Sequence, residues 1–215
     1  MKLFLDTAET EIIKAHLSRG LVDGVTTNPT LIMKSGRNPD DVYQELVDLG
    51  INNISMEVMG NAKEMMSEAV RLVDKFEHQA TIKVPCTEDG LYVCRLLHKM
   101  DVDVNVTLIF SASQAVLAAK AGAAYVSPFV GRVDDNSFDG IQLIRDIDSI
   151  FSKHMVDTEI LSASIRSAKQ VSDSFAAGAD IVTLPPSVLD KMYNHVLTDA
   201  GLAQFEKDWS SVTHH

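Results

Sequence analysis

Residues 81–90, TIKVPCTEDG, combine a buried strand with a charge in its middle. Side chains alternate faces along a strand, so Ile82 and Val84 share one face while Thr81 and Lys83 share the other. An unpaired charge in an apolar setting carries a large free-energy cost. Lys83 therefore points at water, pairs with an acid, or is kept there to react as a neutral amine.

Outward from this stretch, short β-rich runs alternate with helical patterns along the whole chain. Helix signals separate the runs: Asn38 and Pro39 begin one helix, Ser111 and Gln114 form a capping box. Gly122 ends that helix, and another runs over 167–177 and is closed by a glycine. The expected strands cover residues 2–6, 24–28, 53–58, 80–85, 102–108, 124–130, 159–164 and 180–184.

About eight β/α units predict a single (β/α)8 barrel domain over residues 1–215. A doubly wound open sheet is the alternative, but neither GxGxxG nor GxxxxGK[ST] occurs to favour it. After the last strand, the chain is longer than an eighth helix requires. We expect an additional helical tail over about residues 198–212. Phe205 and Trp209 lie four apart on one face of this tail, where they pack on the barrel or on a neighbouring subunit.

Composition is that of an ordinary globular protein, with 215 residues, 46% hydrophobic residues and a net charge of −11. Such a negative field disfavours nucleic acid, so any phosphate must be captured locally by a few converging cations. The apolar runs are too short to span a bilayer, and residues 1–6 already read as a strand instead of a signal peptide. We expect a cytoplasmic protein.

No spacing of cysteine or histidine suggests a metal or cofactor. Cys86 and Cys94 lie eight apart, which matches no metal or redox motif, and buried thiols are the simpler interpretation. The terminal His214 and His215 are given no function. We expect no metal and no cofactor.

Polar residues fall on one face of nearly every expected strand. The outer face of a parallel barrel packs against helices and must be apolar, so the polar face points inward. Most of these residues lie late in their strands, at the carboxyl-terminal mouth where such barrels hold their sites. The inward set comprises Asp6, Thr26, Asn28, Glu57, Thr81, Lys83, Asn105, Thr107, Ser127, Phe129, Ser162 and Ser164.

Small hydroxyl residues such as Thr26, Ser162 and Thr183 are readily explained as fillers of barrel layers. Asp6, Glu57 and Lys83 are not, because three ionisable groups are costly in a core. A structural ion-pair network is the alternative explanation for these three.

A buried lysine becomes nucleophilic when its amine is neutral, and its typical product is a Schiff base with a ketone or aldehyde. The iminium withdraws electrons, so an adjacent carbon–carbon bond breaks without a metal. Carboxylates such as Asp6 and Glu57 divide the proton transfers. The residues alone thus predict a Schiff-base lyase or transferase.

Two arginines follow consecutive strands at the same mouth, Arg132 in SPFVGR and Arg166 in SASIR. The guanidinium fork suits phosphate. Each alone is more often a solvated arginine, but two above a reactive lysine favour a phosphorylated substrate.

In sum the chain resembles the transaldolase family, specifically its short single-domain branch. The motifs that carry the resemblance are FLDTA (4–8), GVTTNPTLI (24–32), IKVPCTEDGL (82–91), NVTLIFS (105–111), SPFVGR (127–132), SASIR (162–166) and FEKDW (205–209). The resemblance implies a class I Schiff-base barrel that moves a dihydroxyacetone unit from sedoheptulose 7-phosphate or fructose 6-phosphate to glyceraldehyde 3-phosphate or erythrose 4-phosphate, in the pentose phosphate pathway.

The resemblance also implies a role for each matching residue. Lys83 carries the imine, and Asp6 accepts the proton from the hydroxyl beside the bond being cleaved. Glu57 acts through a catalytic water that Thr107 helps to hold. The substrate-binding residues are Asn28, Asn105 and Ser127 for the dihydroxyacetone hydroxyls, and Arg132, Arg166 and Ser164 for the phosphate.

The same branch contains fructose-6-phosphate aldolases, which release free dihydroxyacetone. They have Gln, Tyr and Lys where this chain has Glu57, Phe129 and Arg166, so the resemblance favours a transaldolase over the aldolase alternative. A non-catalytic sugar-phosphate binder is a further alternative, but a binder needs no buried lysine. The resemblance also implies a homo-oligomer, because members of this branch commonly assemble as rings of five, often paired into decamers, with the C-terminal helix crossing to a neighbour.

Overall fold

A closed barrel of eight parallel strands forms the centre of the protein in the computed structural model, which describes residues 1–212. Neighbouring strands pair in chain order, and the last pairs with the first, Leu3 opposite Val182. The predicted (β/α)8 barrel is therefore confirmed and the open sheet is wrong. The strands are β1 Lys2–Asp6, β2 Gly24–Thr26, β3 Ile54–Glu57, β4 Ala80–Pro85, β5 Val104–Ile109, β6 Tyr125–Pro128, β7 Glu159–Ser162 and β8 Ile181–Leu184.

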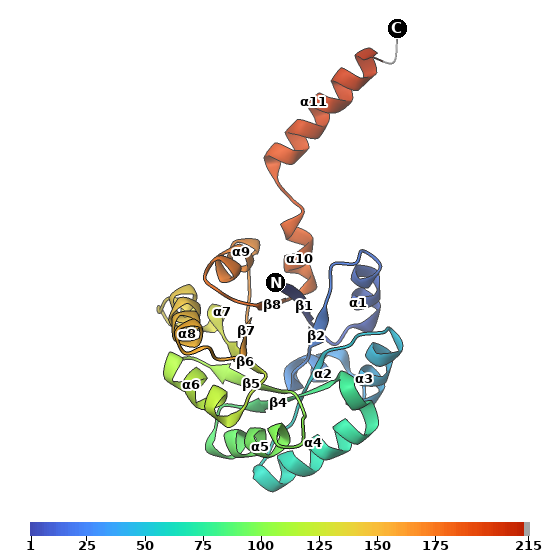
Figure 1. The fold of residues 1–215 in the computed structure, drawn as a ribbon. Coiled ribbons are helices and arrows are strands. Elements are labelled where there is room, and N and C mark those ends of the chain that lie inside the picture. The colour runs from blue at the N-terminus through green and yellow to red at the C-terminus, as the bar shows by residue number, and fades with distance from the viewer. Residues whose placement is uncertain (213–215) are drawn as a thin grey trace.

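Helices surround the barrel (Figure 1) and cover the outer, apolar face of its strands. The helical elements among residues 1–212 are α1 Thr10–Leu17, α2 Pro29–Ser35, α3 Pro39–Asp48, α4 Ala62–Phe76, the 3-10 turn η1 Glu77–Gln79, α5 Glu88–His98, α6 Ala112–Ala121, α7 Val130–Asp135, α8 Gly140–His154, α9 Ala168–Ala176, α10 Pro186–Met192 and α11 Val196–Val212. His214 and His215 lie outside the described residues.

Capping side chains begin the helices where the sequence predicts. Asn38 caps α3 by accepting a hydrogen bond from the backbone N–H of Asp40. Ser111 caps α6, but Gln114 accepts from the N–H of Phe110 instead of that of Ser111. Only the Ser111 half of the predicted capping box is therefore formed.

Two apolar layers hold the fold together. The larger lies between strands and helices and contains most of the buried side chains. The smaller fills the barrel interior with Phe4, Leu161, Ala163 and Ile181. Gly24 is required beside it, because a Cβ there would lie 2.6 Å from the Phe4 ring. The polar residues of the mouth rest on this inner layer.

The residues of strand β7 alternate between the two faces, but the set that faces inward is the opposite of the predicted one. Leu161 and Ala163 face the barrel interior, and Ser162 instead shares a 2.9 Å hydrogen bond with Ser174 of α9, outside the barrel. The placement of Ser162 on the inward face was therefore wrong. Ser164 still reaches the mouth, because its φ of +59° turns the chain out of the strand pattern.

Strand β5 is also irregular, at a register shift between Val106 and Ile109. Leu108 has a φ of +60°, which lets Thr107 face the interior while Ile109 joins the outer core. Both irregularities lie at the carboxyl ends of strands, where barrels of this kind build their sites.

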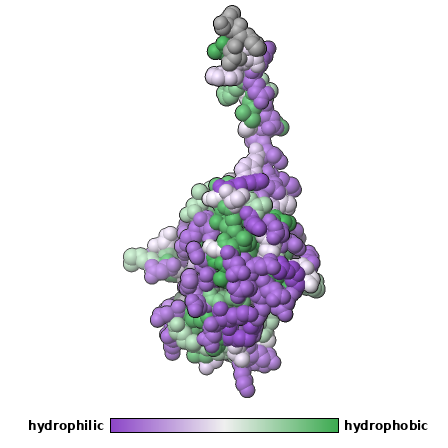
Figure 2. Space-filling view, turned by 90° about the vertical axis from the view of Figure 1, so that its right-hand side faces the viewer, coloured by the Kyte–Doolittle hydropathy of each residue, from purple (hydrophilic) through white to green (hydrophobic). Residues whose placement is uncertain are grey.

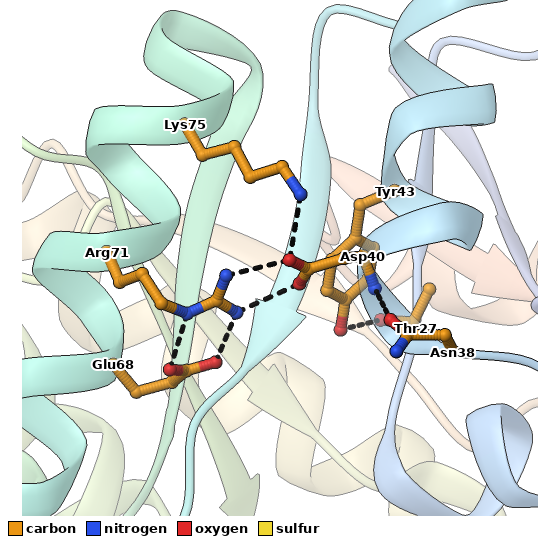
Figure 3. Close-up of polar contacts among 7 residues, drawn as sticks. All are labelled: Thr27, Asn38, Asp40, Tyr43, Glu68, Arg71 and Lys75. Carbon is orange, nitrogen blue, oxygen red and sulfur yellow. Dashed lines mark hydrogen bonds and ion pairs between the residues drawn. The ribbon is translucent and has the colours of Figure 1, made fainter.

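Helices α3 and α4 are joined by a charged network (Figure 3). Asp40 of α3 accepts hydrogen bonds from Arg71 and Lys75 of α4, and Glu68 binds the same arginine. Behind this network, the hydroxyl of Tyr43 lies 3.4 Å from the hydroxyl of Thr27, the residue after β2.

Helix α11 projects away from the barrel (Figures 1 and 2) and has no buried residue. This helix is the extra C-terminal element that the sequence predicts. Its exposed apolar side chains Leu202, Phe205, Trp209 and Val212 follow a helical spacing of three and four. Among residues 1–212, no helix is long and apolar enough to cross a membrane.

Candidate active site

Lys83 lies in the middle of β4 with its amine directed into the barrel. The Nζ atom donates to the carbonyl oxygen of Thr27 at 3.0 Å and lies 3.1 Å from Glu57 Oε2. Glu57 faces it because the two residues are register partners on neighbouring strands. Lys83 is 4% exposed, so this charge is neither directed at water nor left without a partner.

Asp6 occupies the end of β1 and receives a 2.8 Å hydrogen bond from the hydroxyl of Thr26, its register partner on β2. Thr26 in turn shares a 2.6 Å hydrogen bond with Thr183 of β8. Burial raises the pKa of the Asp6 carboxyl, while the charge of Lys83 and the Thr26 hydroxyl act to lower it. Thr26 therefore does more than fill a barrel layer.

A cavity of about 100 Å³ opens above these groups at the carboxyl-terminal mouth. Most of the predicted site residues border it, whereas Glu57, Asn105 and Arg166 do not. Its lining is Asp6, Thr26, Asn28, Lys83, Thr107, Ser127, Phe129, Arg132, Ala163, Ser164 and Thr183.

Asn105 is fully buried beside the cavity, where its side chain is held from both ends. Its Nδ2 donates to Ser55 Oγ at 3.2 Å, and its Oδ1 accepts from Ser127 Oγ at 2.7 Å. These two contacts hold the Asn105 amide between the strands and connect it to Ser127 at the cavity wall.

Two polar groups of the lining keep hydrogen-bonding capacity toward the cavity. Thr107 Oγ1 is buried and bonds to no group among the described residues. Asn28 uses its Oδ1 to cap α2 through the N–H of Leu31, and its Nδ2 has no partner in the same part of the chain. A buried hydroxyl without a partner costs about 1–3 kcal/mol, so Thr107 favours cavity contents that hydrogen-bond.

The two arginines of the mouth differ in their surroundings. The Arg132 guanidinium lies 4.7 Å from the centre of the Phe129 ring and borders the cavity. Arg166 lies outside the lining and donates to Asp135 of α7 at 2.5 Å. The sequence predicted that both arginines lie at the mouth. It did not predict that Asp135 binds Arg166.

Sequence reasoning missed Thr27, whose backbone carbonyl binds Lys83. Alternation assigns its side chain to the outer face, and its hydroxyl indeed donates to Ser55 O at 2.9 Å. A carbonyl contact leaves no trace in side-chain patterns, so no signal in the sequence identifies it. The inward position of Thr26 was predictable from alternation, because Thr26 shares a strand face with Asn28. Its hydrogen bond to Asp6 was not predicted.

Chemically, the arrangement combines a buried amine, a carboxylate in contact with it and a second carboxylate on the same cavity. Such a set supports imine formation with proton transfer at two positions. Among residues 1–212, no group of three or more His, Cys, Asp or Glu side chains is placed to hold a metal ion. Cys86 is half-buried and Cys94 buried, and both are free thiols.

Comparisons with known proteins find similar sequences over nearly the whole chain. A family model described as "Transaldolase/Fructose-6-phosphate aldolase" matches residues 3–215. A protein of Caulobacter vibrioides named "Probable transaldolase" is 48% identical over 212 residues, covering 99% of this chain and 98% of the relative. Proteins with the same name from Paracoccus denitrificans and Methanococcus vannielii are each 49% identical, over 99% and 98% of this chain and 98% of either relative.

Proposed function

This chain belongs to the transaldolase/fructose-6-phosphate aldolase family and is an enzyme, a transaldolase, and we propose that Lys83 is the residue that carries its Schiff base. The single observation that carries this proposal is the burial of the Lys83 amine beside Glu57, on the cavity that Asp6 also borders. Its substrates are ketose and aldose phosphates, as befits the family.

The reaction begins when the neutral amine of Lys83 attacks the ketone carbon and the adduct loses water to give an iminium. Glu57 lies close enough to Nζ to take the ammonium proton, and it moves later protons at this atom through a water that Thr107 holds. Both assignments rest on the contacts of Lys83 and on the hydroxyl of Thr107, which is directed at the cavity.

Asp6 then accepts the proton of the hydroxyl beside the bond that breaks. The bonding electrons flow into the iminium, so the aldose phosphate leaves and an enamine stays on Lys83. Attack of the enamine on an acceptor aldehyde reverses these steps, with Asp6 returning the proton. Hydrolysis of the new iminium restores the free amine and releases the product ketose.

Binding contacts follow from the lining. Asn28, Asn105 and Ser127 are assigned to the dihydroxyacetone hydroxyls, with Asn105 acting from its buried position behind Ser127. Arg132 is assigned to the phosphate, together with Ser164 and Arg166, which follow β7. Phe129 offers an apolar cavity wall that cannot donate a proton to the enamine.

The test is release of glyceraldehyde 3-phosphate from fructose 6-phosphate with and without erythrose 4-phosphate. Acceptor-dependent release is expected, because an enamine that is not protonated remains on the enzyme until an acceptor aldehyde reacts with it, and only then does the next fructose 6-phosphate react. Equal release without acceptor would identify the aldolase alternative and contradict the interpretation of Glu57, Phe129 and Arg166.

A second experiment tests Lys83 itself and excludes a non-catalytic binder. Borohydride reduction with fructose 6-phosphate should attach the substrate carbons to Lys83, as located by peptide mass spectrometry. Lys83→Met should give no adduct, and Lys191→Met, which changes an exposed lysine of α10, should react as the original chain does. An adduct that persists in Lys83→Met would refute the assignment.

For the whole protein we propose one cytoplasmic barrel domain that assembles as a homo-oligomer, a pentamer or decamer, through α11. The support is the apolar stripe of this helix, in which Phe205 and Trp209 are each 70% exposed in the single chain. Helices present such stripes when another surface covers them.

A further inference from the structure

The two arginines assigned to phosphate are not equally available to a ligand. Arg132 borders the cavity that Lys83 and Ser164 also line, and its guanidinium is supported by the Phe129 ring. Arg166 is absent from that lining and is 53% exposed, with its Nη2 donating to Asp135 Oδ2. The guanidinium of Arg132 is available to an anionic ligand, whereas that of Arg166 already binds the carboxylate of Asp135.

Arg166 is held close to α7 by backbone packing as well as by charge. A Cβ added at Gly131 would lie 2.7 Å from Arg166 Nε and 2.1 Å from the carbonyl oxygen of Ser164. The N–H of Gly131 donates to that same carbonyl at 3.1 Å. Glycine at 131 thus allows the arginine stem to lie over the start of α7, within reach of Asp135 at its end.

We propose that Asp135 is a built-in competitor that holds Arg166 outside the cavity until the phosphate group of a substrate displaces it. This inference rests on the proposed function, which assigns Arg166 to phosphate binding. The carboxylate and the phosphate are both anions that bind the same guanidinium donors, so Arg166 exchanges one for the other.

The strength of the Arg166–Asp135 pair suits such an exchange. Both side chains are about half exposed, and ion pairs of this kind contribute little free energy because water screens them. A phosphate accepts through several oxygens at once and carries more charge than a carboxylate. A sugar without phosphate has no anion to offer, so Arg166 then stays with Asp135 and only phosphorylated substrates gain the second arginine.

Asp135→Asn is the direct test, because it removes the competing charge and preserves the shape of the side chain. We expect KM for fructose 6-phosphate to fall by about three- to fivefold, the factor that a weak exposed ion pair supplies. The value of kcat should not change, because Arg166 contacts the phosphate equally before and during the reaction. Inhibition by inorganic phosphate should strengthen by a similar factor.

Asp139→Asn is the matched control. It removes the same charge near the same mouth, and asparagine retains the cap that Asp139 provides to the N–H of Gln142 in α8. Its KM should equal that of the original chain. In the Arg166→Gln background, Asp135→Asn should have no effect on KM, because the residue acts through this arginine.

An unchanged or raised KM in Asp135→Asn, with normal acceptor-dependent release in the original chain, overturns the proposal. Failure of the proposed function would look different: the original chain would lack that release, or Arg166→Gln would leave KM unchanged. Calorimetric titration of each variant with inorganic phosphate tests the competition without turnover. Asp135→Ser serves as a second variant in both measurements.

Discussion

At the scale of single residues, burial, the charge of Lys83 and the hydroxyl of Thr26 together set the pKa of Asp6. Burial raises the pKa of this carboxyl, and the Thr26 hydroxyl acts in the opposite direction by donating to the charged form. A general base must be ionised, so activity is lost as the pH falls through its pKa. The acidic limb of the rate profile therefore reports on Asp6.

Thr26→Val should move that limb to higher pH. Loss of the donor removes a stabilising contact to the carboxylate, so the pKa of Asp6 rises further. The measurement is kcat/KM for acceptor-dependent release across the acidic range. Thr81→Val is the control, because Thr81 donates to Asn53 on a different part of the barrel wall. A limb that stays in place would show that another group controls it.

Phe129→Tyr should convert part of the transfer activity into release of free dihydroxyacetone. The ring borders the cavity of Lys83, so a hydroxyl added there is a proton donor near the enamine. The measurement is the ratio of release without acceptor to release with it, and this ratio should increase. Phe110→Tyr is the control, because Phe110 packs edge-on against Phe129 but is absent from the cavity lining. Equal ratios in both variants would contradict the role of Phe129.

Alternation along strands was sufficient to predict that Lys83, Glu57 and Asp6 share the barrel interior. It was not sufficient for the Thr27 carbonyl or for the pairing of Arg166 with Asp135. The first is a backbone contact, and the second joins the end of α7 to the segment after β7, whose close approach depends on Gly131. Side-chain patterns contain no information on either.

At the scale of elements, Asp40 links α3 to α4 (Figure 3). Hydrogen bonds from Arg71, and then from Lys75, lower the pKa of its carboxyl to about 2. A pKa lowered by folding stabilises the native state above the unfolded value of 3.8, and this contribution is lost as the pH falls toward 2. The arginine and lysine are more than 40% exposed, so the contribution is discounted to about 1 kcal/mol.

Asp40→Asn should therefore lower the free energy of unfolding by about 1 kcal/mol at neutral pH and much less near pH 2. Urea unfolding followed at both pH values measures the difference. Asp41→Asn is the control, because Asp41 lies in the same first turn of α3 without an ion pair among the described residues. An equal loss in both variants would assign the effect to the helix dipole instead of the network.

The order and type of the elements followed from periodicity and helix caps, and every predicted strand has its counterpart in the barrel. The misplaced residue was Ser162 of β7. Alternation assumes a regular strand up to its end, whereas β7 gives way to Ser164 with a positive φ. The bulge at Leu108 is equally invisible, because leucine is not a residue that signals a left-handed backbone.

At the scale of the whole molecule, the exposed stripe of α11 predicts association. Replacing Phe205 and Trp209 together by serine should dissociate the oligomer, because these side chains are the largest apolar groups of the stripe. Light scattering after gel filtration should then give the monomer mass of 23.5 kDa. Lys207→Ala, on the opposite side of the helix, should leave the larger mass intact. A monomer mass for the original chain would refute the assembly.

Closure of the barrel also has a consequence in time. Strand β1 pairs with β2 on one side and with β8 on the other, so its second neighbour is among the last segments to be synthesised. Until then β1 presents an open edge of unpaired N–H and C=O groups, the kind of edge that joins wrong partners. Pairing of β8 with β1 closes the ring and removes this edge.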